Sequence, residues 1–204
     1  MKALVLLAIA TACVLVAGTA HRASAATPYA YDAVLATLAR ETLWQAGREN
    51  SHLTRSDVRS VGVRCYRTSR SFDATFERRF GGTPRQVVGY YAGGRDLNLR
   101  PEICANTRAF FRGEVTMRNA GAYAVLLHEA LHRQGVRNER VTTCFADEAV
   151  RWGMRWYGFG DAEAVRGRNL AFEYTRLYAP PRYRMGKPNC LLLVRHKGWP
   201  SFAA

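Results

Sequence analysis

Two histidines four residues apart flank a glutamate in the segment His128-Glu129-Ala130-Leu131-His132. Residues four apart on an α-helix lie on the same face, so both imidazoles can bind one zinc ion, at about 2.0–2.1 Å each. Glu129 follows the first histidine directly, and from there its carboxylate can reach a zinc-bound water but not the zinc. It can take a proton from that water during attack on a carbonyl carbon and pass it to the leaving amine. The motif therefore predicts zinc-dependent hydrolysis of peptide bonds, with Glu129 as general base.

A catalytic zinc site also needs a third protein ligand and an open fourth position. The sequence matches the longer pattern HExxHxxGxxH as far as Gly135, and Asn138 stands where the last histidine would be. An amide oxygen is a poor zinc ligand, whereas the carboxylate of the next residue, Glu139, is a good one. Glu148 is a rival because it lies on the apolar stripe of the following helix, and a site without a third carboxylate is the remaining alternative. Asp147 faces another way and is expected to be solvated.

The segment from Tyr123 to Glu148 resembles two groups of proteins. One is the compact gluzincin-type peptidases, zincins in which a glutamate on the helix after HExxH is the third ligand. The other is a group of small secreted HExxH proteins of high-GC bacteria, in which HExxHxxG precedes Asn/Asp-Glu and a Cys-aromatic-Ala segment, here Cys144-Phe145-Ala146. The resemblance implies a zincin-like fold, a zinc cofactor, a peptide or protein substrate, and His128, His132 and Glu139 as ligands. It departs from the gluzincin pattern at Thr143, where an acid that braces a histidine is usual.

Hydrophobic periodicity and capping residues predict the elements that position these side chains. A strong helical pattern between Asn119 and Gly135 places the motif on a helix; the alternative is a surface helix with two solvated histidines. Further helices are expected at 31–44, 71–80, 101–111, 139–157 and 161–178, and strands at 60–66, 86–91, 96–100 and 191–194.

These elements predict an α+β, zincin-like fold, with a small antiparallel sheet, the HExxH helix and a following helix. In such a fold the third strand lies beside the cleft. Its segment Leu97-Asn98-Leu99 is then expected to offer its backbone edge to an extended peptide by strand addition.

The N-terminal residues have the order of a secretory signal peptide. Lys2 is followed by an apolar run from Ala3 to Gly18 and then by the small-residue cleavage site Ala23-Ser24-Ala25. The run is shorter than the roughly 20 residues that a spanning helix needs, which disfavours the alternative of a retained membrane anchor. We expect a signal peptide at residues 1–25 and a single metallopeptidase domain at 26–204. The protein is then secreted or associated with the cell envelope, with no membrane span after signal removal.

Four cysteines remain after the expected cleavage site. An even number in an exported protein indicates two disulfide bonds, for which we favour the pairs Cys104–Cys144 and Cys65–Cys190. The rival is a cysteine-ligated zinc, which is disfavoured because no two of these cysteines form a C-x-x-C pair.

The basic charge is large but spread along the chain. The net charge is +14, and only three of the 30 basic residues are lysines. No nucleic-acid-binding motif accompanies the arginines, so we expect no nucleic acid partner, whereas an anionic cell envelope is compatible with this charge. We expect a monomer. Two alternatives to the peptidase remain, a non-catalytic envelope-binding module on a zincin scaffold and a zinc amidase that acts on cell-wall peptides.

Overall fold

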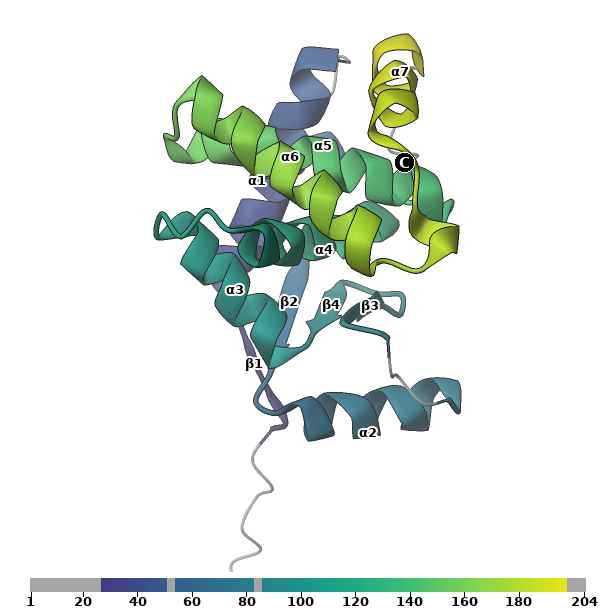
Figure 1. The fold of residues 1–204 in the computed structure, drawn as a ribbon. Helices are drawn as coiled ribbons and strands as arrows, with labels where there is room; N and C mark the ends of the chain where they lie inside the picture. The colour runs from purple at the N-terminus through teal and green to yellow at the C-terminus, as the bar shows by residue number, and fades with distance from the viewer. Residues whose placement is uncertain (1–26, 51–53, 83–85, 198–204) are drawn as a thin grey trace, which may run out of the picture.

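The structure, a computed structural model, describes residues 27–50, 54–82 and 86–197 (Figure 1). The expected signal peptide, residues 1–25, lies outside these ranges. The described chain is α+β, as predicted, with a four-stranded sheet and seven α-helices. The strands are β1 (Tyr29–Tyr31), β2 (Gly62–Tyr66), β3 (Gly89–Tyr91) and β4 (Asp96–Leu99). The helices are α1 (Ala33–Asn50), α2 (Ser69–Phe80), α3 (Pro101–Phe111), α4 (Met117–Arg133), α5 (Glu139–Tyr157), α6 (Asp161–Tyr178) and α7 (Lys187–Lys197), with short 3-10 turns η1 (Arg55–Asp57) and η2 (Pro181–Tyr183).

The sheet is mixed, which corrects the expected antiparallel sheet. Its strand order is β1-β2-β4-β3, with β2 and β4 parallel and the two outer pairs antiparallel. Parallel neighbours need a crossover connection, and α2 with β3 supplies it. A strand pattern read from the sequence shows which residues alternate but not which strand lies beside which.

The order of the strands also corrects the expected substrate edge. The segment Leu97–Leu99 belongs to β4, which pairs with β2 on one side and β3 on the other, so its backbone is used inside the sheet. The strand at this end of the sheet is β3. It packs beside α4, the helix that carries the HExxH motif.

Helix α4 lies at the centre of the molecule, between the sheet and the helices α5 and α6 (Figure 1). It begins where the Thr116 side chain accepts a hydrogen bond from the backbone N–H of Asn119, which satisfies one of the donors left open at a helix start. Its apolar face is fully buried at Leu126, Leu127 and Leu131. Burial of this face holds the opposite, polar side of the helix, with both histidines, in a fixed direction.

Small residues let the helices around α4 approach closely. A Cβ atom at Gly121 of α4 would lie 2.1 Å from the Tyr174 ring on α6, and one at Gly153 of α5 would lie 2.0 Å from the Tyr123 hydroxyl. Neither position has room for a larger side chain. These two glycines therefore fix the spacing of α4 against α5 and α6.

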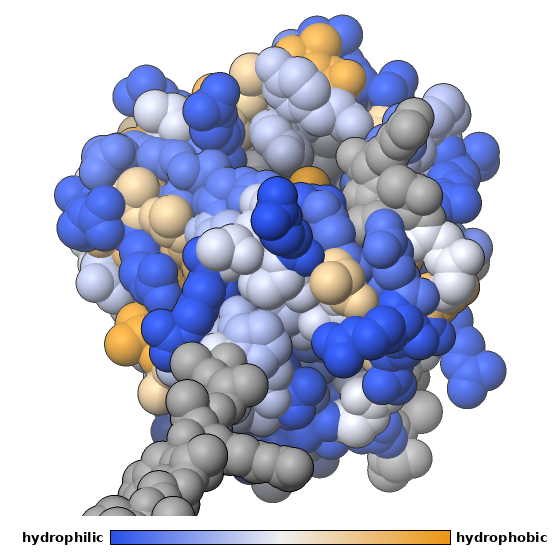
Figure 2. Space-filling model, turned by 90° about the horizontal axis from the view of Figure 1, so that it is seen from below, coloured by the Kyte–Doolittle hydropathy of each residue, from blue (hydrophilic) through white to orange (hydrophobic). Residues whose placement is uncertain are grey.

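The surface drawn from the side of α2 is mostly hydrophilic, with its hydrophobic residues in small scattered patches (Figure 2). Among the described residues, no helix is both long enough and apolar enough to span a bilayer.

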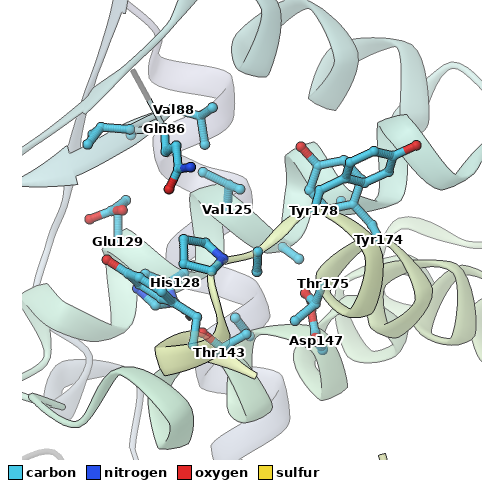
Figure 3. Close-up of a pocket in the computed structure, with 18 of the residues that line it drawn as sticks. Gln86, Val88, Val125, His128, Glu129, Thr143, Asp147, Tyr174, Thr175 and Tyr178 are labelled. Carbon is cyan, nitrogen blue, oxygen red and sulfur yellow. Dashed lines mark hydrogen bonds between the residues drawn. The ribbon is translucent and has the colours of Figure 1, made fainter. Parts of the chain in front are cut away.

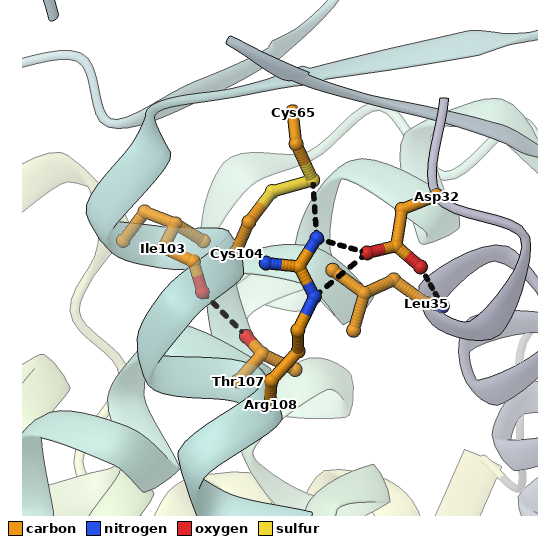
Figure 4. The surroundings of a disulfide bond; sticks show 7 residues. All are labelled: Asp32, Leu35, Cys65, Ile103, Cys104, Thr107 and Arg108. Atoms are coloured by element: carbon orange, nitrogen blue, oxygen red, sulfur yellow. Dashed lines mark hydrogen bonds and ion pairs between the residues drawn. A yellow bond between two sulfur atoms is a disulfide. The ribbon is translucent and has the colours of Figure 1, made fainter. Parts of the chain in front are cut away.

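The disulfide bonds join Cys65 to Cys104 and Cys144 to Cys190, so the expected pairing was wrong. Because β4 runs parallel to β2, the first turn of α3, directly after β4, comes beside the end of β2. Figure 4 shows this bond beside Arg108, whose guanidinium pairs with the Asp32 carboxylate.

The second bond joins α5 to α7. The segment 191–194, which was expected to form a strand, is instead part of α7. A short apolar run does not distinguish a strand from a helix. Pro188, near the start of α7, fits the first turn of a helix. The Cys144–Cys190 bond holds α7 against α5.

Candidate metal centre

Three side chains from α4 and the start of α5 converge on one point. The Nε2 atoms of His128 and His132 lie 2.9 Å apart, and the Oε2 atom of Glu139 lies 3.0 Å from the first and 3.2 Å from the second. We call these three residues the His–His–Glu cluster. Among the described residues it is the one group of histidine, cysteine and acidic side chains close enough to hold a metal ion.

The turn between α4 and α5 brings Glu139 to the histidines. Gly135 adopts a φ of 98°, a left-handed conformation that glycine tolerates, and the chain reverses there. Asn138, at the position of the expected histidine, is the N-cap of α5 and accepts a hydrogen bond from the Val141 backbone. Glu139 is therefore the first residue of α5, and its side chain points back toward α4.

Each histidine is held through its other ring nitrogen. The Nδ1 atom of His132 lies 2.7 Å from the Val136 carbonyl oxygen, and the Nδ1 atom of His128 lies 3.1 Å from the Thr143 hydroxyl. Thr143 therefore contacts a histidine at the position where the gluzincin pattern has an acid. When each Nδ1 carries the proton, each Nε2 has a lone pair directed into the cluster, which is the state that metal binding needs. The contact with Val136 could not be predicted from its side chain, because it is made by the backbone carbonyl. The turn at Gly135 was its one indication in the sequence.

The cluster has the donors and the size for a divalent cation. Two nitrogen lone pairs and a carboxylate oxygen repel one another unless a proton or a metal ion lies between them. Ligands of a tetrahedral zinc at about 2.0–2.1 Å lie roughly 3.3 Å apart, only slightly more than the sides of this triangle. A shift of a few tenths of an ångström would therefore admit zinc.

The electrostatics of the cluster favour a cation as well. Although burial opposes it, hydrogen bonding to the two histidines lowers the pKa of Glu139 to about 2. Burial also opposes charge on His132, yet its hydrogen bond to Glu139 and the charge of Glu129 raise the pKa of this imidazole. The cluster thus attracts positive charge, which a proton or a metal ion can supply.

Glu129 lies beside the cluster without belonging to it. The residue is only 7% exposed, and burial raises the pKa of its carboxyl group, against the lowering effect of the neighbouring histidines. Gly89 of β3 allows this close approach, since a Cβ atom there would lie 3.3 Å from the Glu129 Cγ atom. The backbone of Tyr91, also on β3, hydrogen-bonds to the carboxylate. The general base expected from the sequence is thus held between α4 and the edge strand.

A cavity of about 180 Å³ opens beside the cluster and Glu129 (Figure 3). We call it the side pocket; its lining residues come from the segment 86–89, α4, α5, α6 and the segment 179–183, and include Val125, His128, Glu129, Thr143, Asp147, Tyr174, Thr175 and Tyr178. Its volume is far above the roughly 10–15 Å³ that one water molecule needs. The Tyr183 ring lies 5.6 Å from the His128 ring, centre to centre.

The two adjacent acids on α5 have different surroundings from those expected. Glu148, the rival third ligand, is absent from the cluster and forms ion pairs with Arg151 at 3.3 Å and Arg168 at 3.4 Å. Asp147, expected to be solvated, is 1% exposed and lines the side pocket. The sequence did not reveal this because the pattern along α5 does not show which of its faces α6 covers; in the structure α6 lies over Asp147 and its Thr175 hydrogen-bonds to it.

The chain matches no protein-family model, and no curated protein or solved structure is significantly similar to it. The resemblance described above therefore depends on the motif and its near neighbours alone.

Proposed function

We propose that this chain is an exported, zinc-dependent metallopeptidase with a zincin-like arrangement of its active-site helix and sheet. The observation that carries the proposal is the convergence of His128, His132 and Glu139 to within 3.2 Å, with Glu129 beside them. Two nitrogens and one carboxylate form the ligand set of many catalytic zinc sites. A structural site would be closed by a fourth protein ligand, whereas this cluster adjoins a cavity.

Different residues of the chain have different roles in the proposed hydrolysis. The His–His–Glu cluster would hold the zinc ion, which would supply a Lewis acid for the substrate carbonyl and make a water molecule acidic enough to lose a proton near neutral pH. Glu129 accepts the proton of the attacking water and returns it to the leaving amine. Val136 and Thr143 hold the two imidazoles in the orientation and protonation state that ligation needs.

The edge strand β3 is the proposed binding site for the substrate backbone. It forms the end of the sheet, adjoins α4 and leads from the segment 86–89, which lines the side pocket. An extended peptide can add to such an edge through main-chain hydrogen bonds, while its side chains enter pockets. The substrate is accordingly an extended stretch of peptide or protein.

The two disulfide bonds and the basic charge support an extracellular or envelope location. Disulfides persist in oxidising compartments, and both bonds here join separate elements of the core. A net charge of +14 favours association with anionic polymers of a cell envelope.

Metal analysis combined with a peptide-library digest tests the proposal. We expect one zinc per chain, and Glu129→Gln should keep the metal while hydrolysis falls roughly 10²–10⁴-fold. His132→Ala should lose the metal. Glu173→Gln, the same chemical change as at Glu129 but on an α6 residue that pairs with Arg176, should leave both properties unchanged.

Two results would contradict the proposal. Unimpaired cleavage by the Glu129→Gln variant would remove the general base from its role. Stoichiometric zinc in a wild-type protein that cleaves no peptide would favour the binding module instead.

A further inference from the structure

Asp147 and Glu148 are neighbours on α5 that are both buried but differ in their partners. The Glu148 carboxylate pairs with two guanidinium groups, those of Arg151 and Arg168. Within the described part of the chain, no basic side chain pairs with Asp147; its carboxylate accepts a hydrogen bond from the Thr175 hydroxyl at 3.0 Å. Asp147 is therefore a buried acid that, once ionised, would have no partner of opposite charge among the described residues.

This acid faces the side pocket beside the proposed catalytic residues. Figure 3 shows His128 and Glu129 on one side of the pocket and Asp147 with Thr175 on the other. A substrate residue next to the scissile bond, held at the cluster, can place its side chain in this pocket. The carboxyl group of Asp147 would then meet the end of that side chain.

We propose that Asp147 makes the side pocket selective for a lysine or arginine side chain next to the scissile bond. The inference rests on the proposed peptidase function and deepens it, because it names the substrate class. The pocket walls suit such a side chain: Val125, Ala146 and the rings of Tyr174 and Tyr178 can cover its aliphatic part, and the acid lies across the pocket from His128 (Figure 3).

The protonation of Asp147 explains how the pocket can be stable when empty. Burial, opposed by the Thr175 hydrogen bond and assisted by the nearby charge of Glu148, raises the pKa of Asp147 to about 8. At neutral pH the empty pocket thus holds a neutral acid. An entering cation favours the ionised form, because the low dielectric of the pocket strengthens the attraction that offsets the loss of water around the two charges.

The other charged groups around the pocket do not replace the substrate cation. Arg182 also lines the pocket, but it is exposed and its guanidinium contacts the Tyr183 hydroxyl at 3.4 Å. Arg168 contacts Glu148 and Asn169. His128 and Glu129 belong to the catalytic side of the pocket.

Peptides that differ only at the residue next to the scissile bond test the inference. Lysine, arginine, norleucine, glutamine and glutamate would be compared in turn on each side of the bond, with the cleaved bond identified by mass spectrometry. The wild-type enzyme should prefer lysine over norleucine, which has nearly the same shape without the charge, by about tenfold or more in kcat/KM. In Asp147→Asn this ratio should collapse toward one. Asp161→Asn, the same change at an exposed position outside the pocket, should leave the ratio unchanged.

A second measurement does not depend on catalysis. The Asp147 carboxyl carbon would be followed by NMR during a pH titration of the full chain, with n-butylammonium or n-butanol added. n-Butylammonium should lower the apparent pKa of Asp147, and n-butanol should not.

The outcomes separate the two proposals. Cleavage without a basic preference, or a preference that survives in Asp147→Asn, overturns the pocket assignment and leaves the peptidase. Equal kcat/KM values for the glutamine and lysine peptides also overturn it, because Asp147 would then bind the side chain as a neutral acid and not as a carboxylate. A protein that cleaves nothing but shows the n-butylammonium effect overturns the peptidase and supports a pocket for cations.

Discussion

The hydroxyl of Thr143 lies 3.1 Å from the Nδ1 atom of His128. When His128 binds a metal ion through Nε2, its Nδ1 carries the proton, and the hydroxyl accepts the hydrogen bond that an acid usually accepts. A neutral acceptor fixes the ring orientation as an acid does, but it adds no negative charge behind the imidazole. In this site the carboxylate of Glu139 contacts both imidazoles directly from the other side. In the proposed metal site the negative charge thus belongs to a ligand, Glu139, and does not lie behind the imidazole.

Replacement of Thr143 by valine tests this brace. Thr143→Val keeps the shape but removes the acceptor, and we expect zinc affinity to fall about 10–100-fold. Competition against a chromophoric chelator measures it. Thr107→Val is the matched control, since Thr107 is a buried threonine on α3 whose hydroxyl donates to the Ile103 carbonyl oxygen. Equal zinc affinities for Thr143→Val and the wild type would show that the contact has no role in metal binding.

Asp147 should make the stability of the protein depend on pH in an unusual direction. Its pKa is about 8 in the folded chain against an ordinary 3.8, so between these values the folded state holds a proton that the unfolded state has released. This contribution to stability is present in full below pH 3.8 and is lost as the pH rises to about 8. Asp147→Asn removes the dependence, so its advantage over the wild type should grow across this range, by up to about 1.4 kcal/mol per pH unit.

Denaturant unfolding at several pH values measures the difference in free energy of unfolding between Asp147→Asn and the wild type. Because both proteins contain the His–His–Glu cluster, its titration contributes equally to both and cancels in the difference. Asp161→Asn, at an exposed ion pair, should show no such trend. A constant difference between pH 4 and 8 would mean that Asp147 is already ionised in the empty pocket.

At the scale of elements, local patterns were predictable and long-range partners were not. The HExxH helix, the helix after it and Glu139 as the nearby acid follow from spacing within some twenty residues, and the structure places all three together. The position of β4 inside the sheet and the disulfide pairing depend on which distant elements meet. Asp147 belongs to the second kind, because α6 buries it. Periodicity along one helix does not reveal what packs against it.

The contact between α4 and α6 gives a prediction at this scale. In Gly121→Ala the new Cβ atom would overlap the Tyr174 ring at 2.1 Å, so the ring must leave its place or the helices must separate. We expect a loss of about 1–3 kcal/mol in the free energy of unfolding, together with a changed side pocket, which Tyr174 lines. Gly186→Ala is the control, since a Cβ atom there meets open space. Unchanged thermal unfolding of Gly121→Ala would contradict the close approach.

At the scale of the whole molecule, the segment after α6 forms part of the wall of the site. The segment from α6 to α7 includes η2 and carries Pro180, Arg182 and Tyr183 along the side pocket. The Cys144–Cys190 bond fastens α7 to α5, one residue from Thr143. The Cys65–Cys104 bond joins β2 to α3, away from these residues.

The two disulfides should therefore have similar effects on stability and different effects on catalysis. Their sequence separations, 39 and 46 residues, are close, so the loss of either bond should reduce stability by a similar amount, about 2–4 kcal/mol. Only the Cys144→Ala/Cys190→Ala variant should release the segment that lines the side pocket, and its KM should rise more than that of the Cys65→Ala/Cys104→Ala variant. Denaturation midpoints and steady-state kinetics on one peptide, well below the unfolding temperature, separate the two effects. An equal rise in KM for both variants would show that this segment keeps its place without the bond, held by the packing of α7 against α5 alone.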